Sequence, residues 1–184
     1  NVLLERGDHV IVTYPGYESL YEIARSLGCD VTPWLPEKGD AWRFDLERLA
    51  ASIRRSTRLI VVNFPHKPTG ASLTHDQFRE LLNLVQDRDI AVFSDEMYRL
   101  LEYDRSAGLE AACDVYENAV SLFGMSKTFA LAGLRIGWLA TRNRSLLNSF
   151  AAFKDYTTIC SSAPSEVLAL MALRARETII ARNL

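Results

Sequence analysis

Short apolar runs alternate with amphipathic segments along the chain. A continuous run rich in valine, isoleucine and leucine predicts a strand that is covered on both faces. Apolar residues spaced three and four positions apart predict a helix with one buried face. The runs that predict strands are 9–14, 29–34, 58–63, 90–94, 119–123 and 136–140, and the segments that predict helices are 17–27, 45–55, 74–87, 145–155 and 165–184.

Turn and capping residues separate these elements. Pro15-Gly16 follows the first strand, Gly28 ends the first helix, and the segment 36–40 is rich in turn formers. Thr74 and Gln77 have the spacing of a capping box, in which the two side chains bond each other's exposed amides. Because strands and helices alternate, we expect an α/β fold, a three-layer αβα domain with a mostly parallel central sheet.

Composition narrows the functional class. The chain has 184 residues, of which 48% are hydrophobic, so it is long enough to bury the core of one domain. A net charge of -2 argues against nucleic acid as a partner. No stretch approaches the roughly 20 apolar residues of a membrane helix and no leader opens the chain, so we expect no membrane partner. Three widely separated cysteines, without a CxxC motif, favour a reducing, cytoplasmic location over a disulfide framework or a zinc site.

Residues whose side chains can bind a ligand or take part in catalysis follow most of the predicted strands. Ligands of such a sheet bind outside the carboxyl ends of its strands, where parallel strands present the residues that follow them. We therefore expect one edge of the sheet to carry an aromatic ring, a carboxylate, a phenol and several cations. These candidates are Tyr17, Lys67, Asp95, Tyr98, Ser126, Lys127 and Arg135.

These residue types together suit one cofactor. A lysine amine condenses with an aldehyde to form a Schiff base, and a pyridine aldehyde held in this way accepts electrons from an amino-acid carbanion. A carboxylate keeps the ring nitrogen protonated, arginine and hydroxyl groups bind a phosphate, and an aromatic ring stacks on the pyridine. The pattern predicts pyridoxal 5'-phosphate (PLP).

Six of the candidates also have a structural interpretation. Lys127 is a possible solvated side chain of a loop that contains glycine and serine, and Asp95 is a possible helix cap. Tyr98 and Tyr17 are possible packing aromatics, Ser126 is a possible turn former, and Arg135 is a possible partner in a surface ion pair. The wider sequence around them favours chemistry.

Residues 124–137, GMSKTFALAGLRIG, resemble the PLP-attachment signature of the class I/II aminotransferases, which are fold type I enzymes. Residues 63–70, NFPHKPTG, are similar to the N-x-P-x-N-P-T-G loop of that family, and residues 95–98, DEMY, are similar to its D-E-x-Y motif. The resemblance covers essentially the whole chain, with the motifs in the family's order.

The resemblance implies a role for each candidate. Lys127 would hold PLP as a Schiff base and act as the catalytic base and acid. Asp95 would pair with the ring nitrogen, and Tyr98 would donate to the 3-oxygen of PLP. Arg135 and Ser126 would bind the phosphate, and Tyr17 would stack on the ring. The implied reaction moves an amino group between an amino acid and a 2-oxo acid, in a protein that is a homodimer at full length.

Two positions depart from the family. Lys67 stands where the loop of the family has an asparagine that donates to the 3-oxygen. Its ammonium would either donate in place of the amide and favour the phenolate, or turn to solvent and leave the oxygen without that partner. Gly124 stands where many relatives carry a phosphate-binding serine.

The resemblance also suggests a partial protein. The chain begins at Asn1 rather than methionine, and we expect residues 1–184 to be the PLP-binding large domain truncated at both ends, without the N-terminal Gly-rich loop and the C-terminal small domain. Weak PLP affinity and little activity would follow. The alternatives are another fold type I PLP enzyme, of the C–S lyase or acyl transferase type, and a catalytically silent fragment of such an enzyme. A Rossmann dehydrogenase is disfavoured, because no G-x-G-x-x-G follows a strand.

Overall fold

A six-stranded sheet forms the centre of the computed structural model, which describes residues 2–39 and 41–184. The strand order is β2-β1-β5-β6-β7-β8, and every neighbouring pair is parallel except β7 and β8. The predicted three-layer αβα architecture with a mostly parallel sheet is confirmed. The strands are β1 (His9–Thr13), β2 (Asp30–Trp34), β5 (Thr57–Asn63), β6 (Ala91–Asp95), β7 (Ala119–Gly124) and β8 (Gly137–Ala140).

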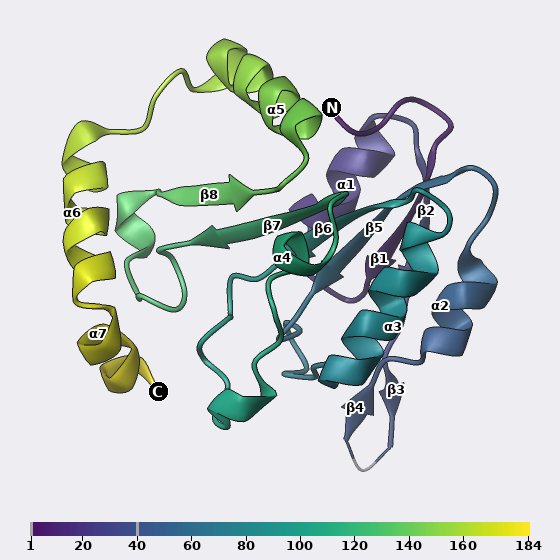
Figure 1. Ribbon diagram of the computed structural model, residues 1–184, viewed down its shortest axis with the longest axis horizontal. Helices are drawn as coiled ribbons and strands as arrows, with labels where there is room; N and C mark the ends of the chain where they lie inside the picture. The colour runs from purple at the N-terminus through teal and green to yellow at the C-terminus, as the bar shows by residue number, and fades with distance from the viewer. Residues whose placement is uncertain (1, 40) are drawn as a thin grey trace.

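Helices cover the two faces of this sheet (Figure 1). The helices are α1 (Ser19–Ser26), α2 (Leu46–Ser52), α3 (His75–Gln86), α4 (Ala112–Val115), α5 (Arg144–Thr157), α6 (Ala163–Arg174) and α7 (Arg176–Asn183). Two short 3-10 turns, η1 (Arg105–Ala107) and η2 (Ala132–Leu134), lie between these strands and helices. Figure 1 shows α6 and α7, in yellow, at the side of the molecule opposite α2.

The alternation of side chains along each strand divides the core into two layers. Val10 and Val12 of β1 pack toward α1, while Ile11 between them packs toward α2 and α3. Ile60 and Val62 of β5 join Ile11 in the larger layer. Burial on both faces explains why these strands have continuous apolar runs.

Local signals fixed several helix ends. The hydroxyl of Thr74 accepts the N–H of Gln77 at 3.2 Å, and the N–H of Thr74 donates to Oε1 of Gln77 at 3.0 Å, so the predicted capping box is confirmed. Asp45 caps α2 by accepting the N–H of Glu47 at 2.8 Å. The predicted helix 45–55 therefore begins where expected but ends at Ser52.

Other expectations about local structure were wrong. The predicted loop 36–40 is part of a hairpin of β3 (Glu37–Lys38) and β4 (Trp42–Arg43), although Asp40 lies outside the described residues, as does Asn1. The helix predicted over 165–184 is interrupted at Ala175, whose φ of -97° and ψ of 17° end α6 and begin α7. Within the described ranges, no helix has both the length and the apolar character needed to cross a bilayer.

Candidate active site

The carboxyl ends of β1, β5, β6 and β7 lie at one edge of the sheet, because these strands are neighbours and parallel. Tyr17 follows β1, Lys67 follows β5, Asp95 ends β6, and Lys127 follows β7. Because β8 runs antiparallel to β7, its first residues lie at this same edge. The reversal places Arg135 near the end of β7, although it precedes β8.

All seven predicted site residues line one cavity of about 740 Å³. The polar part of the cavity lies at the edge of the sheet, and its apolar part extends between the sheet, α1 and α5, where Ile23 and Phe153 contribute. The structure therefore brings together every candidate, none of which points to a separate surface. The seven residues are Tyr17, Lys67, Asp95, Tyr98, Ser126, Lys127 and Arg135.

Charge in the cavity is divided between a buried acid and exposed cations. Asp95 is only 6% exposed, and burial raises the pKa of its carboxyl from 3.8 to about 6. The N–H of Met97 opposes this rise in pKa by donating to Oδ1 of Asp95 at 3.1 Å. The side chains of Lys67, Lys127 and Arg135 are exposed. The cavity thus suits a ligand that carries several negative charges, together with a hydrogen-bond donor or cation that can pair with Asp95.

Tyr98 is carried by the turn that follows β6. The N–H of Arg99 donates to the carbonyl of Glu96 at 3.0 Å, and the N–H of Leu101 donates to the carbonyl of Tyr98 at 3.1 Å. Burial, and then the charge of Asp95, raise the pKa of the Tyr98 phenol above its ordinary value. Tyr98 therefore stays protonated at neutral pH and can donate a hydrogen bond into the cavity.

Lys67 lies over the ring of Tyr17 at the open side of the cavity. Its Nζ is 5.9 Å from the centroid of that ring, which is within the range of a cation–π contact. Tyr17 is 57% exposed, so the pair is accessible to a ligand. Lys67 is thus exposed and also lines the cavity.

Asn63 is a site residue to which sequence analysis assigned no role. Its Nδ2 donates to the carbonyl of Asp95 at 3.0 Å, and its Oδ1 accepts the N–H of Lys67 at 2.9 Å. The N–H of Asn63 in turn donates to the hydroxyl of Thr13 at 3.2 Å. This buried amide connects the ends of β1, β5 and β6. The only signal in the sequence was its place as first residue of the NFPHKPTG segment.

The loop that carries Lys127 is closed by backbone hydrogen bonds. The N–H of Leu131 donates to the carbonyl of Met125 at 2.9 Å, and the N–H of Met125 donates to the carbonyl of Ile136 at 3.0 Å. The side chains of Met125 and Phe129 are buried in a cluster with Ala169 of α6. With the loop fixed in this way, Lys127 is the residue exposed to the cavity.

Gly124, at the end of β7, lies close to the backbone at the start of β8. A Cβ at this position would lie 3.0 Å from the carbonyl oxygen of Ile136 and 3.2 Å from the Cα of Gly137. A side chain here would require these backbone atoms to move by a few tenths of an ångström, and this close approach favours glycine.

Solved structures of known proteins share the fold of this chain. Solved structures of similar fold include a PLP-dependent aminotransferase from Streptococcus suis, with a TM-score of 0.91, 35% identity, and coverage of 99% of this chain and 48% of that one. The N-succinyldiaminopimelate aminotransferase from Mycobacterium tuberculosis has a TM-score of 0.91 and 25% identity, with the same coverage. The fold is therefore that of the fold type I PLP-dependent aminotransferases.

Sequence comparison identifies the family. The family described as aminotransferase class I and II matches residues 1–181, and the chain belongs to it. A capreomycidine synthase from Streptomyces vinaceus is 32% identical over 177 residues, which is 96% of this chain and 45% of that protein. A probable aspartate aminotransferase from Methanocaldococcus jannaschii is 26% identical over 183 residues. The match covers 97% of this chain and 48% of that protein. The chain spans about half the length of these relatives.

Proposed function

We propose that residues 1–184 are the PLP-binding large domain of an aminotransferase that moves an amino group between an amino acid and a 2-oxo acid. The observation that supports this function best is the convergence of Lys127, Asp95 and Arg135 on one cavity. An amine, a buried carboxylate and a guanidinium are the groups that an aldehyde, a ring nitrogen and a phosphate require. Membership of the class I and II family supports the same cofactor.

Each residue contributes through its own chemistry. PLP, when bound, supplies an electron sink for the bonds at the α-carbon of an amino acid. Lys127 would hold the aldehyde with its amine and, once released, carry a proton to and from that carbon. Asp95 would accept a hydrogen bond from the protonated ring nitrogen and so keep it protonated, and Arg135 with Ser126 would bind the phosphate.

The remaining side chains would set the position of the ring. Tyr98 would donate to the 3-oxygen, and Tyr17 would stack on one face of the ring, close to the Lys67 ammonium. The family resemblance also favours a homodimer of the full-length protein, and the three widely separated cysteines favour the cytoplasm. The substrates would be an amino acid and a 2-oxo acid.

A second function uses the same cofactor for different chemistry. The relative from Streptomyces vinaceus is called a synthase and not an aminotransferase. Another fold type I PLP enzyme, such as a C–S lyase or an acyl transferase, is therefore the second candidate. Product analysis separates the two, because an aminotransferase yields a 2-oxo acid and the aminated cofactor, whereas a β-eliminating lyase yields pyruvate and ammonia.

The first experiment is a titration of the chain with PLP. We expect a new absorption band, and a mass increase on Lys127 after borohydride reduction. The variant Lys127→Ala should lose both. Lys154→Ala is the matched control, because Nζ of Lys154 only donates to the carbonyl of Ile159 in an exposed part of α5, and this variant should keep both signals. A band that survives in Lys127→Ala, or no band at all in the folded wild-type chain, would contradict the assignment and favour a catalytically silent fragment.

A further inference from the structure

The turn formed by residues 96–101 holds two groups of the site. It carries Tyr98, and it carries the N–H of Met97, which donates to the Asp95 carboxyl at 3.1 Å. Leu100 in this turn has a φ of 71°, in the left-handed region that residues with a side chain seldom adopt. A turn of this kind needs anchors to keep one conformation.

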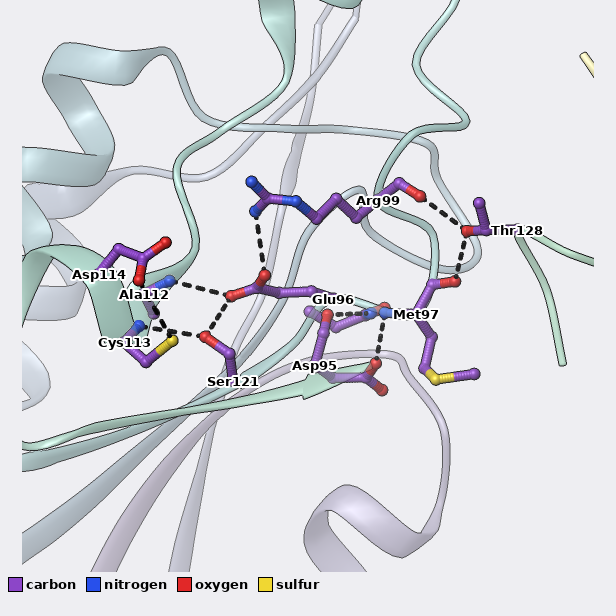
Figure 2. Close-up of polar contacts among 10 residues, drawn as sticks. Asp95, Glu96, Met97, Arg99, Ala112, Cys113, Asp114, Ser121 and Thr128 are labelled. Carbon is purple, nitrogen blue, oxygen red and sulfur yellow. Dashed lines mark hydrogen bonds and ion pairs between the residues drawn. The ribbon is translucent and has the colours of Figure 1, made fainter. Parts of the chain in front are cut away.

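The first anchor is Glu96, which faces away from the cavity into a buried polar cluster (Figure 2). Its Oε1 accepts the hydroxyl of Ser121 at 2.7 Å and the N–H of Ala112 at 3.0 Å. Its Oε2 accepts Nη1 of Arg99 at 3.1 Å. Glu96 therefore attaches the start of the turn to β7 and α4.

The second anchor is Thr128, the residue that follows Lys127 in the chain. Its side chain is fully buried. Figure 2 shows its hydroxyl between two carbonyl groups of the turn, at 2.7 Å from the oxygen of Arg99 and 3.3 Å from the oxygen of Met97. The carbonyl of Thr128 also accepts Nδ2 of Asn183 in α7 at 3.0 Å.

These contacts make a short connection between the lysine and the acid of the site. Lys127 is bonded to Thr128, the Thr128 hydroxyl contacts the carbonyl of Met97, and the N–H of Met97 donates to Asp95. The two opposite ends of the cofactor site are thus linked behind the cavity wall through one hydroxyl group.

We propose that Thr128 is a positioning residue, whose buried hydroxyl fixes the turn 96–101 against the Lys127 loop and so holds the Met97 N–H on the Asp95 carboxylate. Asp95 and Lys127 have here the roles given to them in the proposed function, on which the importance of Thr128 rests. Without the hydroxyl, the partly buried carbonyls of Arg99 and Met97 lose the donor that lies between them, and the turn becomes free to move.

The measurable consequence is a change at Asp95. A carboxylate that loses an N–H donor becomes harder to ionise, so the pKa of Asp95 should rise above its wild-type value of about 6, by about one pH unit. The charged and titratable groups that share the cavity with Asp95, or follow it in the chain, are unchanged in the variant; they are Lys67, Tyr98, Lys127, Arg135 and Glu96.

The experiment is a carbon-13 NMR titration of the Asp95 carboxyl in the PLP-free chain, with the signal assigned by its loss in Asp95→Asn. Thr128→Val should raise the pKa, whereas Thr128→Ser, which keeps the hydroxyl, should retain the wild-type value. Thr57→Val is the matched control. Thr57 is also a buried threonine, and its hydroxyl makes two hydrogen bonds, with His9 and with the N–H of Arg54. Thr57 begins β5 and therefore lies at the edge of the sheet opposite the cavity.

All of these titrations are made without cofactor, and their outcomes decide whether Thr128 positions the turn. An unchanged Asp95 pKa in Thr128→Val, or an equal rise in Thr57→Val, would overturn it. If Thr128→Val does not fold, Thr128→Ala replaces it, and failure of both to fold while Thr128→Ser folds would show a role in stability alone and would also overturn it. Because no PLP is present, this result is independent of the Lys127→Ala titration that tests the proposed function.

Discussion

Asp95 and His66 are buried at the same edge of the sheet, and burial moves the pKa of each toward its uncharged form. The pKa of Asp95 rises to about 6, and the pKa of His66 falls to about 4. Nδ1 of His66 is 2.8 Å from the hydroxyl of Thr69, while Nε2 has no hydrogen-bond partner among the described residues. Between these two pKa values both side chains are largely neutral.

This relationship predicts opposite pH effects on the stability of the PLP-free chain. A raised carboxyl pKa stabilises the fold at low pH, and this contribution is lost as the pH rises from about 4 through about 6. Asp95→Asn should therefore unfold at a higher temperature than wild type at pH 8. The difference, up to roughly 3 kcal/mol, should disappear at pH 4. Thermal unfolding at both pH values measures it, and a variant no more stable than wild type at pH 8 would contradict a buried charge at Asp95.

The opposite change of stability with pH is expected for His66. A lowered histidine pKa stabilises the fold above pH 6.5, and this contribution is lost as the pH falls through about 4. His66→Gln should lose less stability than wild type between pH 7 and pH 4, even if it is less stable throughout. His75→Gln is the control, because the pKa of His75 is raised by hydrogen bonds to Glu110 and Ser106 and is not lowered by burial as that of His66 is. Equal acid sensitivity of His66→Gln and wild type would show that His66 is not held neutral.

Lys67 should tune the bound cofactor. An ammonium near the 3-oxygen favours the phenolate and so lowers the pKa that governs the absorption spectrum of the lysine-bound cofactor. Lys67→Asn should raise that pKa, by about one pH unit. Lys38→Asn, which removes a lysine lying over Trp42 in the β3–β4 hairpin, should not change it. The measurement is absorbance against pH in the PLP-loaded protein, and identical curves for Lys67→Asn and wild type would refute the idea.

Gly124 should not readily accept the serine that the family resemblance suggests at this position. The Cβ of Gly124→Ser would meet the backbone of Ile136 and Gly137, so we expect a loss of about 1–3 kcal/mol and no gain in PLP affinity. Gly133→Ser is a suitable comparison, because nothing lies within 4 Å of the added Cβ there. Denaturant unfolding measures both. Tighter PLP binding by a stable Gly124→Ser would mean that the strands separate easily at this point.

Tyr17 should contribute to cofactor binding and little to stability, since more than half of its surface is exposed. Tyr17→Ala should weaken PLP binding roughly threefold to tenfold, while Tyr17→Phe should retain it, because stacking needs the ring and not the hydroxyl. Fluorescence titration with PLP gives the two dissociation constants. Equal affinity for Tyr17→Ala and wild type would restrict Tyr17 to a packing role.

The sequence predicted the sheet and the seven lining residues because strand periodicity and motif spacing are local signals. The β3–β4 hairpin escaped prediction because its strands have only two residues each, too few for an alternating pattern. Asn63 and Thr128 escaped for a different reason: their importance lies in contacts with residues distant in the chain, Asp95 and Arg99. Long-range hydrogen bonds of buried polar groups leave no periodic trace in a sequence.

The reversed direction of β8 has a consequence for how this site tolerates evolutionary change. The amine of Lys127 and the guanidinium of Arg135 line the same cavity from the two ends of a single connection, residues 128–134. An inserted or deleted residue in that connection would displace one group relative to the other, even if every side chain were kept. We therefore expect substitutions there to be accepted far more readily than changes in length.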